Sequence, residues 1–413
     1  MEHESKILRN KNFVFLLLGH FISLMGEKLS TIVFFSIAVT IVGTESSIYA
    51  TLLLAVQYIP YFLFGYFFGT LADKVSKKLL LVIADLSRAL AIIIILFVQD
   101  SLVLLYIVVA ILGLFTGMFE PTKKSLIPFI VNREDLYKFN KVNAVLEITA
   151  MFLGLVLGTI FLSHFSVDDA LKLNIATYLF SLCMVLFISV SGICTDGSKS
   201  KLCRSELYCG IKEGLSYVKS HFELKAIIVC VTVISYLGSG VFYAALSDMS
   251  IKLSDSGISA GVDFGYYLII LALGAASSQI FVKIFEFLKH SDIIKIIYLT
   301  GGVLIAYLAF LFFLMDLKNF YYIGLILFVC GIGIGANYIR VLYLIHHHCE
   351  KKYLGRVVSL NDITHVAMLL IGIIIGSLFI EVFDYKYGFL LAAFIYFMGY
   401  ILTHIAQRKG LNW

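Results

Sequence analysis

The residue with the strongest claim to chemistry is Glu27, which follows Gly26 inside a long apolar stretch. If that stretch is a helix beginning near Asn12, a rise of 1.5 Å per residue puts Glu27 about 22 Å along it, near the centre of a bilayer. A carboxylate there is costly against lipid, so we expect it to face a cavity and to bind and release protons. The alternatives are a fixed pair with a basic group on another helix, or binding of a cationic substrate without coupling.

Two further residues join Glu27 as candidates for proton coupling. Lys28 points about 100° away around the helix, so we expect it to face another cavity wall or to pair with an acid elsewhere. Glu147 lies in a later apolar stretch, where an ionisable residue is a functional candidate by default. The alternative for Glu147 is a structural network with basic residues, namely Arg340, Lys138 or Lys141.

Two other pairs have helical spacing. Asp85 and Arg88 are three residues apart, which predicts an ion pair on one helix face. We interpret this pair as a brace near the membrane edge. Asn337 and Arg340 also share a face, where they could bind an anionic part of a substrate or form a gate pair.

Other chemistry is not indicated. His346, His347 and His348 are consecutive, so their rings point in different directions and make a poor metal site. We therefore predict no metal site and no cofactor. The chain lacks a phosphate-binding Gly-x-x-x-x-Gly-Lys-Ser/Thr motif and has no enzyme motif. Its net charge of +5 requires no nucleic-acid partner.

These side chains must be positioned by membrane helices. The 413 residues are 60% hydrophobic and only 14% charged, far from the roughly 25% charged residues of soluble domains. Because a spanning helix needs about 20 apolar residues, we predict an all-α membrane protein with twelve transmembrane helices. The segments are about 13–42, 47–71, 79–98, 102–121, 139–163, 171–193, 225–248, 264–288, 292–315, 320–346, 357–381 and 387–407.

The basic residues indicate the orientation. They concentrate in alternate connections, whereas the opposite connections hold only Lys172, Lys252, Lys318 and Lys386. Because basic loops favour the cytoplasm, we predict that both termini are cytoplasmic. The longest polar segment, 194–224, would be a cytoplasmic linker with an amphipathic helix at 206–219. It would separate six-helix bundles at 1–193 and 225–413, as in transporters built from two repeats.

A weak internal similarity supports the two repeats. Leu136, Lys138 and Asn143 open the fifth predicted helix, and the eleventh opens with Leu354, Arg356 and Asn361 at the same spacing.

The loop after the second helix carries a resemblance. Its sequence from Gly69 to Lys78 is similar to the signature loop of the major facilitator superfamily, which reads Gly-x-Leu-x-Asp-Arg/Lys-x-Gly-Arg/Lys-Arg/Lys. The chain matches it at Gly69, Leu71, Asp73, Lys74, Lys77 and Lys78 and departs at Ser76, where the family prefers glycine. The resemblance implies a cytoplasmic gate between the two bundles.

We expect this gate to centre on Asp73, which could reach Arg356 or the positive end of the eleventh helix dipole. The alternative for Lys74, Lys77 and Lys78 is that they only set the membrane topology. The other residues assigned to the gate come from the same predicted membrane face, namely Gly65, Asp85, Arg88, Gly355 and Asp362.

Further stretches resemble the macrolide-efflux and siderophore-export branch of the superfamily. They begin at Phe119-Glu120-Pro121 and at Tyr353-Leu354-Gly355-Arg356, and the linker contributes Glu213-Gly214-Leu215. Gly154 and Gly158 resemble the glycines of the antiporter motif, although Leu155 replaces its proline. We expect these glycines to let helices pack closely.

The resemblance thus implies a monomeric, multi-pass transporter in a bacterial inner membrane, in contact with lipid. Its expected activity is efflux of a small amphipathic organic compound in exchange for protons or another ion. The alternatives are an importer, a flippase for a lipid-like substrate, and a ligand sensor that transports nothing.

Overall fold

The structure, a computed structural model, is helical throughout the part of the chain that it describes and contains no β-strand there. The described residues are 10–43, 47–72, 75–131, 136–189, 213, 215–284, 290–315, 320–350 and 353–409. An all-α fold therefore agrees with the sequence prediction over these ranges.

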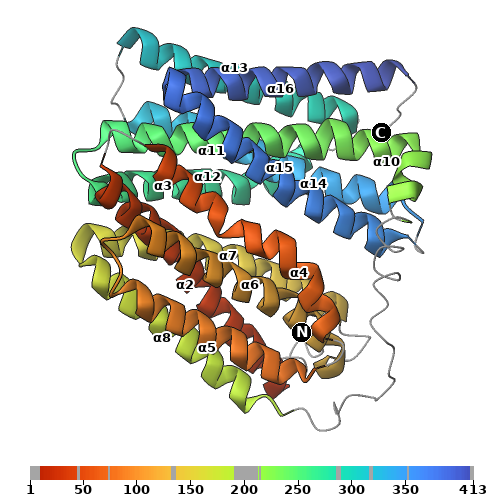
Figure 1. The fold of residues 1–413 in the computed structure, drawn as a ribbon. Helices are drawn as coiled ribbons and strands as arrows, with labels where there is room; N and C mark the ends of the chain where they lie inside the picture. The colour runs from red at the N-terminus through yellow and green to blue at the C-terminus, as the bar shows by residue number, and fades with distance from the viewer. Residues whose placement is uncertain are drawn as a thin grey trace. The chain divides into compact units, whose positions relative to one another are not determined.

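The helices follow one another along the chain (Figure 1). Those of the first half are α2 (Lys11–Val42), α3 (Ser47–Val56), α4 (Tyr58–Ala72), α5 (Lys77–Ile95), α6 (Leu102–Ile130), α7 (Leu136–His164) and α8 (Val167–Phe187). Those of the second half are α10 (Phe222–Ala226), the π-helix η2 (Ile227–Val233), α11 (Ile234–Leu253), α12 (Gly257–Ile284), α13 (His290–Met315), α14 (Phe320–His348), α15 (Leu354–Phe383) and α16 (Tyr385–Arg408).

Ten helices in the described ranges are long and apolar enough to cross a membrane. Two of the twelve predicted segments are not among them. The segment 47–71 is divided into α3 and α4 at Gln57. Helix α5 is only 19 residues long and carries Lys77, Lys78, Asp85 and Arg88.

Local sequence explains where several helices begin. Ser76 precedes α5, and its side chain accepts a hydrogen bond from the backbone N–H of Leu79. Ser101 caps α6 and Ser166 caps α8 in the same way, which satisfies a backbone donor that a helix start leaves free. Ser76 has φ of −52°, so the position where the signature prefers glycine needs no left-handed backbone here.

One predicted boundary is wrong. The fourth segment was expected to end at about 121, where Pro121 and two lysines follow, but α6 continues to Ile130. Pro121 is thus inside a helix, and Lys123 lies on the same helix as Glu120 rather than in a loop.

The described chain divides into two compact units. Unit 1 comprises Met1–Glu45, Leu53–Ser200 and Ser254–Tyr266, and unit 2 comprises Ser46–Leu52, Lys201–Leu253 and Tyr267–Trp413.

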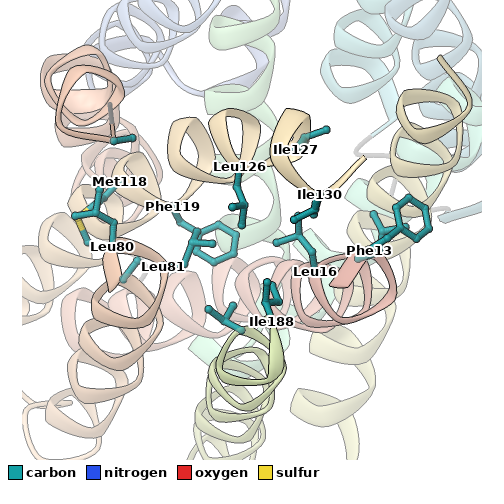
Figure 2. Packing of buried hydrophobic residues seen from close by; sticks show 14 of the residues in the cluster. Phe13, Leu16, Leu80, Leu81, Met118, Phe119, Leu126, Ile127, Ile130 and Ile188 are labelled. Carbon is teal, nitrogen blue, oxygen red and sulfur yellow. The ribbon is translucent and has the colours of Figure 1, made fainter. Parts of the chain in front are cut away.

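In unit 1, α2 packs against both α7 and α8, while α5 and α4 pack against α6. A core of buried apolar side chains joins the beginning of α2, the beginning of α5 and the end of α6 (Figure 2). It includes Phe13, Leu16, Leu81, Phe119 and Ile130. The first part of α12 belongs to this unit too, where Phe264 packs against Phe35 with ring centroids 4.4 Å apart.

In unit 2, α11 packs against α15 and α16, and α13 packs against α16. Glycines permit the α11–α15 contact. A Cβ atom added at Gly372 would lie 3.0 Å from the Cα of Gly240, and one at Gly376 would lie 2.9 Å from the Cα of Val241. Real Cβ contacts are essentially never shorter than 3.0 Å, so both glycines sit where the helix backbones approach most closely.

The same arrangement occurs between α7 and α2 in unit 1. A Cβ at Gly154 would lie 2.8 Å from the Cβ of Lys28, and one at Gly158 would lie 3.1 Å from the Cα of Leu29. The close packing expected of these two glycines is therefore present. Gly372 and Gly376 follow them by 218 residues each, the spacing that also relates Leu136 to Leu354.

Candidate functional site

The most concentrated group of buried ionisable side chains in the described residues surrounds the ammonium of Lys123 in unit 1. Lys123 Nζ lies 2.6 Å from His20 Nε2, 2.8 Å from Glu147 Oε1 and 3.1 Å from Glu120 Oε2. The Lys123 side chain is 2% exposed, His20 is 6%, and the two glutamates are partly exposed. Asn143 Nδ2 donates a further hydrogen bond to Glu147 Oε1 at 2.9 Å.

Three helices bring this cluster together. Glu120 and Lys123 are one turn apart on α6, where a helix places positions three apart on one face. Asn143 and Glu147 are likewise one turn apart on α7, and His20 comes from α2. The apolar core in Figure 2 lies next to it, since Phe119 of that core stacks on His20 with ring centroids 5.8 Å apart.

The cluster does not balance its charge when His20 is neutral. Two carboxylates face one ammonium, and a buried net charge is unfavourable. A proton on His20 or on either carboxylate would neutralise the group. We therefore regard the cluster as a proton-binding site in chemical terms.

His20 Nε2 has two competing partners. It lies 2.6 Å from Lys123 Nζ and 3.2 Å from Glu147 Oε1. Without a proton this nitrogen accepts from Lys123, whereas with one it donates to Glu147. A single nitrogen cannot do both, so protonation would exchange one hydrogen bond for the other.

His20, Glu120 and Glu147 also have the geometry of a metal site, because their ligand atoms lie within 4.8 Å of one another. The ammonium of Lys123 is within 3.1 Å of each of these residues. The position that a metal ion would take is therefore filled by the chain's own cation.

A second buried ion pair lies beside the cluster. Asp85 and Arg88 on α5 form the pair that their spacing predicts, and both side chains are almost fully buried. Ser181 of α8 donates a hydrogen bond of 2.8 Å to Asp85. The guanidinium lies 4.4 Å from the ring centroid of Phe119 and 4.7 Å from that of Tyr178. Phe119 thus touches both Arg88 and His20.

Glu27 is buried in unit 1, and its carboxylate is 2.8 Å from the ammonium of Lys28. The expectation that Lys28 pairs with an acid elsewhere overlooked this neighbour. The flexible lysine chain curls back to Glu27 although the two Cα–Cβ bonds diverge. Glu27 also interacts electrostatically with Arg88, which links it to the second ion pair.

Within the described residues, Glu147 forms ion pairs with Lys123 and His20. The side chains of Lys138 and Lys141 lie outside the described residues, and Arg340 belongs to unit 2.

Unit 2 has a buried polar network without charge. Asn337 Nδ2 donates to Ser235 Oγ at 2.6 Å, and Ser235 Oγ is 2.8 Å from the hydroxyl of Tyr298. That hydroxyl donates to the carbonyl of Cys230 at 2.7 Å, within the π-helix η2. Short π-helical segments are frequent at functional sites.

Several residues assigned to the gate have other partners in the described structure. Lys77 Nζ donates to the carbonyl of Ala72 at 2.9 Å, and Lys78 Nζ donates to the carbonyl of Ile188 at 2.8 Å. Both lysines thus cap helix ends within unit 1. Asp73 and Lys74 lie outside the described residues, as do the surroundings of Gly65, Gly69 and Gly355.

The remaining gate and substrate candidates are distributed over both units. Leu71 packs against the apolar core of unit 1. Arg356 of unit 2 donates to Glu213 at 2.6 Å, in the described end of the linker. Asp362 is exposed, whereas Asn337 and Arg340 are buried on α14. The predicted amphipathic helix at 206–219 lies mostly outside the described residues.

Sequence reasoning missed His20, Glu120 and Lys123. His20 was not among the candidates, Glu120 stood at the end of the predicted segment 102–121, and Lys123 was placed beyond it. The available signal was the Glu-x-x-Lys spacing of 120 and 123, which is useful only once the helix is continued through Pro121.

The long apolar helices and buried ionisable groups define a multi-pass membrane protein of the transporter class. A family model for the Major Facilitator Superfamily matches residues 16–367. The chain belongs to this superfamily and is a transporter rather than an enzyme, which confirms the resemblance seen in the signature loop.

Among curated proteins, the chain is similar to the uncharacterized MFS-type transporter YfiS of Bacillus subtilis, with 22% identity over 52% of this chain and 51% of that protein. A second relative, the uncharacterized MFS-type transporter YvqJ of the same organism, is 26% identical over 53% of this chain and 52% of its own length. The matches thus span about half the length of these relatives.

Solved structures share the fold at low identity. A bacterial homologue of the iron transporter ferroportin has a TM-score of 0.71 at 15% identity, covering 96% of this chain and 98% of its own. The nucleoside transporter NupG has a TM-score of 0.69 at 12% identity, covering 96% and 99%. Identities this low show the fold alone.

Proposed function

We propose that this protein is a proton-coupled exporter of a small amphipathic organic compound. It would work by alternating access in a bacterial cell membrane, with both termini in the cytoplasm. The distribution of basic residues in its loops supports this orientation. The solved neighbours are named for nucleosides, iron and peptides, so the fold by itself selects no substrate.

The observation that carries the proposal is the Lys123 cluster. Two carboxylates and one imidazole surround one ammonium, and the group lacks one positive charge when the imidazole is neutral. A proton supplies that charge. Histidine is the side chain whose ordinary pKa lies nearest to physiological pH.

Proton binding here would also change contacts between helices. With His20 unprotonated at Nε2, α2 is tied to α6 through Lys123; with Nε2 protonated, α2 is tied to α7 through Glu147. A transporter needs such a difference between states, because an ion drives a conformational change only through unequal interactions with the two conformations.

Glu27 provides a second proton-handling position in the proposal. Its pairing with Lys28 and its interaction with Arg88 connect it to the cluster through Arg88 and Phe119. Asp85 and Arg88 would hold this connection rigid. In this scheme Glu147 and His20 exchange the proton, and Glu27 responds to their charge.

The test is proton movement by purified protein in liposomes that contain a pH-sensitive dye. Erythromycin and ethidium serve as amphipathic probes, added to one side of vesicles with a preset pH gradient. Proton flux that begins only when a probe is added, with uphill movement of that probe, is the expected result. Probe movement without protons would point to an uncoupled flippase, and probe binding without any flux would point to a sensor; either result would reject the proposal.

A further inference from the structure

Unit 2 contains a cavity of about 30 Å³ between α11, α13, α14 and α16. Its polar lining consists of hydroxyl and amide groups, among them Ser235, Ser239, Asn337 and Tyr396. None of its lining residues carries a formal charge. A volume of this size suits one or two water molecules, or the hydroxyl end of a larger molecule.

The direction of the hydrogen bonds beside this cavity follows from donor counting. The single hydroxyl proton of Tyr298 is given to the carbonyl of Cys230. Ser235 must therefore donate to Tyr298, and the lone pairs left on Ser235 Oγ accept from Asn337 Nδ2. Because each donor in the chain already has its acceptor, the amide orientation of Asn337 is fixed.

This leaves one acceptor without a partner. Asn337 is 6% exposed, and its Oδ1 atom is buried and receives no hydrogen bond from the described residues. A buried polar atom without a partner is unfavourable. An amide oxygen accepts hydrogen bonds but cannot donate them, so a group that pairs with Asn337 Oδ1 must be a hydrogen-bond donor.

The apolar part of the lining sets a second requirement. Phe242, Leu304, Ile305 and Ile334 line the same cavity. A charged group entering here would be stripped of water without meeting an opposite charge, which is costly. The lining therefore favours a neutral group attached to an apolar body.

We propose that Asn337 Oδ1 is the hydrogen-bond acceptor of a binding site for neutral compounds that carry a hydroxyl or N–H donor. This inference rests on the proposed export function, because it names the class of compound that the protein would export. Ser235 and Tyr298 are positioning residues, because they fix the orientation of the Asn337 amide, and Asn337 lines the cavity. The compound's donor would enter the cavity while its apolar body stays outside.

The readout is equilibrium binding to the full-length protein in nanodiscs, followed by the fluorescence of the bound compound and corrected for uptake by empty nanodiscs. Two probes are compared. Umbelliferone is a coumarin with one phenolic hydroxyl, kept protonated at mildly acidic pH, and its methyl ether lacks only that donor.

Umbelliferone should bind with a Kd about fivefold to tenfold lower than that of its methyl ether, which corresponds to one neutral hydrogen bond. Asn337→Leu should remove the difference. Ser235→Ala keeps the amide but frees it to rotate, so the difference should shrink because the amide N–H can then donate to the ether oxygen. A melting temperature without probe that equals that of the parent shows that each variant is folded.

Equal affinity for the two probes would overturn the proposal, and so would binding of neither, which would mean that only water enters. Ser239→Ala serves as a matched control, because it removes a hydroxyl from the same lining without touching the Asn337 chain. The proposed function is tested separately. Glu147→Gln should leave the difference between the probes unchanged, so a loss of proton coupling and a loss of donor selectivity can be told apart.

Discussion

The two units use the same helix contacts to hold different chemistry. Gly154 and Gly158 bring α7 against α2 in unit 1, and Gly372 and Gly376 bring α15 against α11 in unit 2. Aligning these contacts makes Leu29 equivalent to Val241. By the same alignment, Glu27 corresponds to Ser239, His20 to Thr232 and Glu147 to His365.

The polar partners differ at each of these positions. In unit 1, His20 and Asn143 both contact Glu147, and charge dominates. In unit 2, Thr232 donates to Asn361 at 2.7 Å, and His365 stacks on Tyr236 with ring centroids 3.7 Å apart. Tyr178 of unit 1 lies against Arg88, whereas its equivalent Tyr396 lies against Tyr298. One backbone plan thus supports a charged cluster at these positions in unit 1 and uncharged partners at the equivalent positions in unit 2.

The comparison indicates different roles for the two units. The charged cluster of unit 1 can exchange protons, and the uncharged network of oriented hydroxyl and amide groups in unit 2 can select an uncharged molecule. We therefore expect substitutions in unit 1 to change coupling and those in unit 2 to change selectivity. The following predictions are ordered by the size of the expected effect.

Lys123→Met should have the largest effect, because it leaves Glu120 and Glu147 close together without their cation. Removing one partner of a buried ion pair costs about 3–5 kcal/mol, and we expect the lower end because both glutamates are partly exposed. Thermal unfolding in detergent measures it. Adding Glu147→Gln should recover much of the loss, and failure of this second change to restore stability would show that the cluster is not an electrostatic unit.

Gly154→Ala and Gly372→Ala test whether the two units share their packing. Each adds a methyl group where helix backbones meet, and overpacking of this kind costs about 1–3 kcal/mol. Similar losses of thermal stability in both variants would support the equivalence. A loss of thermal stability in one variant only would show that the two units do not share this helix packing.

Tyr298→Phe should destabilise unit 2 by about 1–2 kcal/mol, because the buried carbonyl of Cys230 loses its donor. Its hydroxyl also accepts from Ser235, so donor selectivity at Asn337 should fall as well. The pH dependence of probe transport should stay as in the parent protein. A shifted pH profile would mean that the neutral network takes part in coupling after all.

Lys172→Ala is the control for the effect of removing a single surface charge. Lys172 and Asp169 form an exposed pair with 3.5 Å between Nζ and Oδ1, and such pairs contribute about 0.2–1 kcal/mol at most. We expect no measurable change in melting temperature or in transport. A large effect here would indicate that single charge changes disturb this protein non-specifically.

Much of the fold could be predicted from the sequence, because long apolar runs and the Gly69–Lys78 loop are local signals. The pair of Asp85 and Arg88 was predictable for the same reason, because side chains three positions apart on a helix lie on the same face. Gly154 and Gly158 likewise predicted a close helix contact.

The charge cluster was not predictable by such local rules. His20, Lys123 and Glu147 come from three helices, and only the packing of α2 against α6 and α7 joins them. Pro121 suggested a helix end, although α6 continues past it. In unit 2, the π-helix and the orientation of the Asn337 amide depend on contacts with Tyr298 and Ser235, which lie far apart in the sequence.

The central claim, that proton coupling resides in unit 1, is tested most directly by comparing Glu147→Gln with His365→Gln, its equivalent in unit 2. Each variant is reconstituted in liposomes, and erythromycin movement is measured both as exchange at equal pH and as accumulation against a pH gradient. We predict that Glu147→Gln keeps exchange but no longer responds to the gradient, while His365→Gln keeps both. A Glu147→Gln protein that accumulates erythromycin in response to the gradient as the parent does would contradict the account.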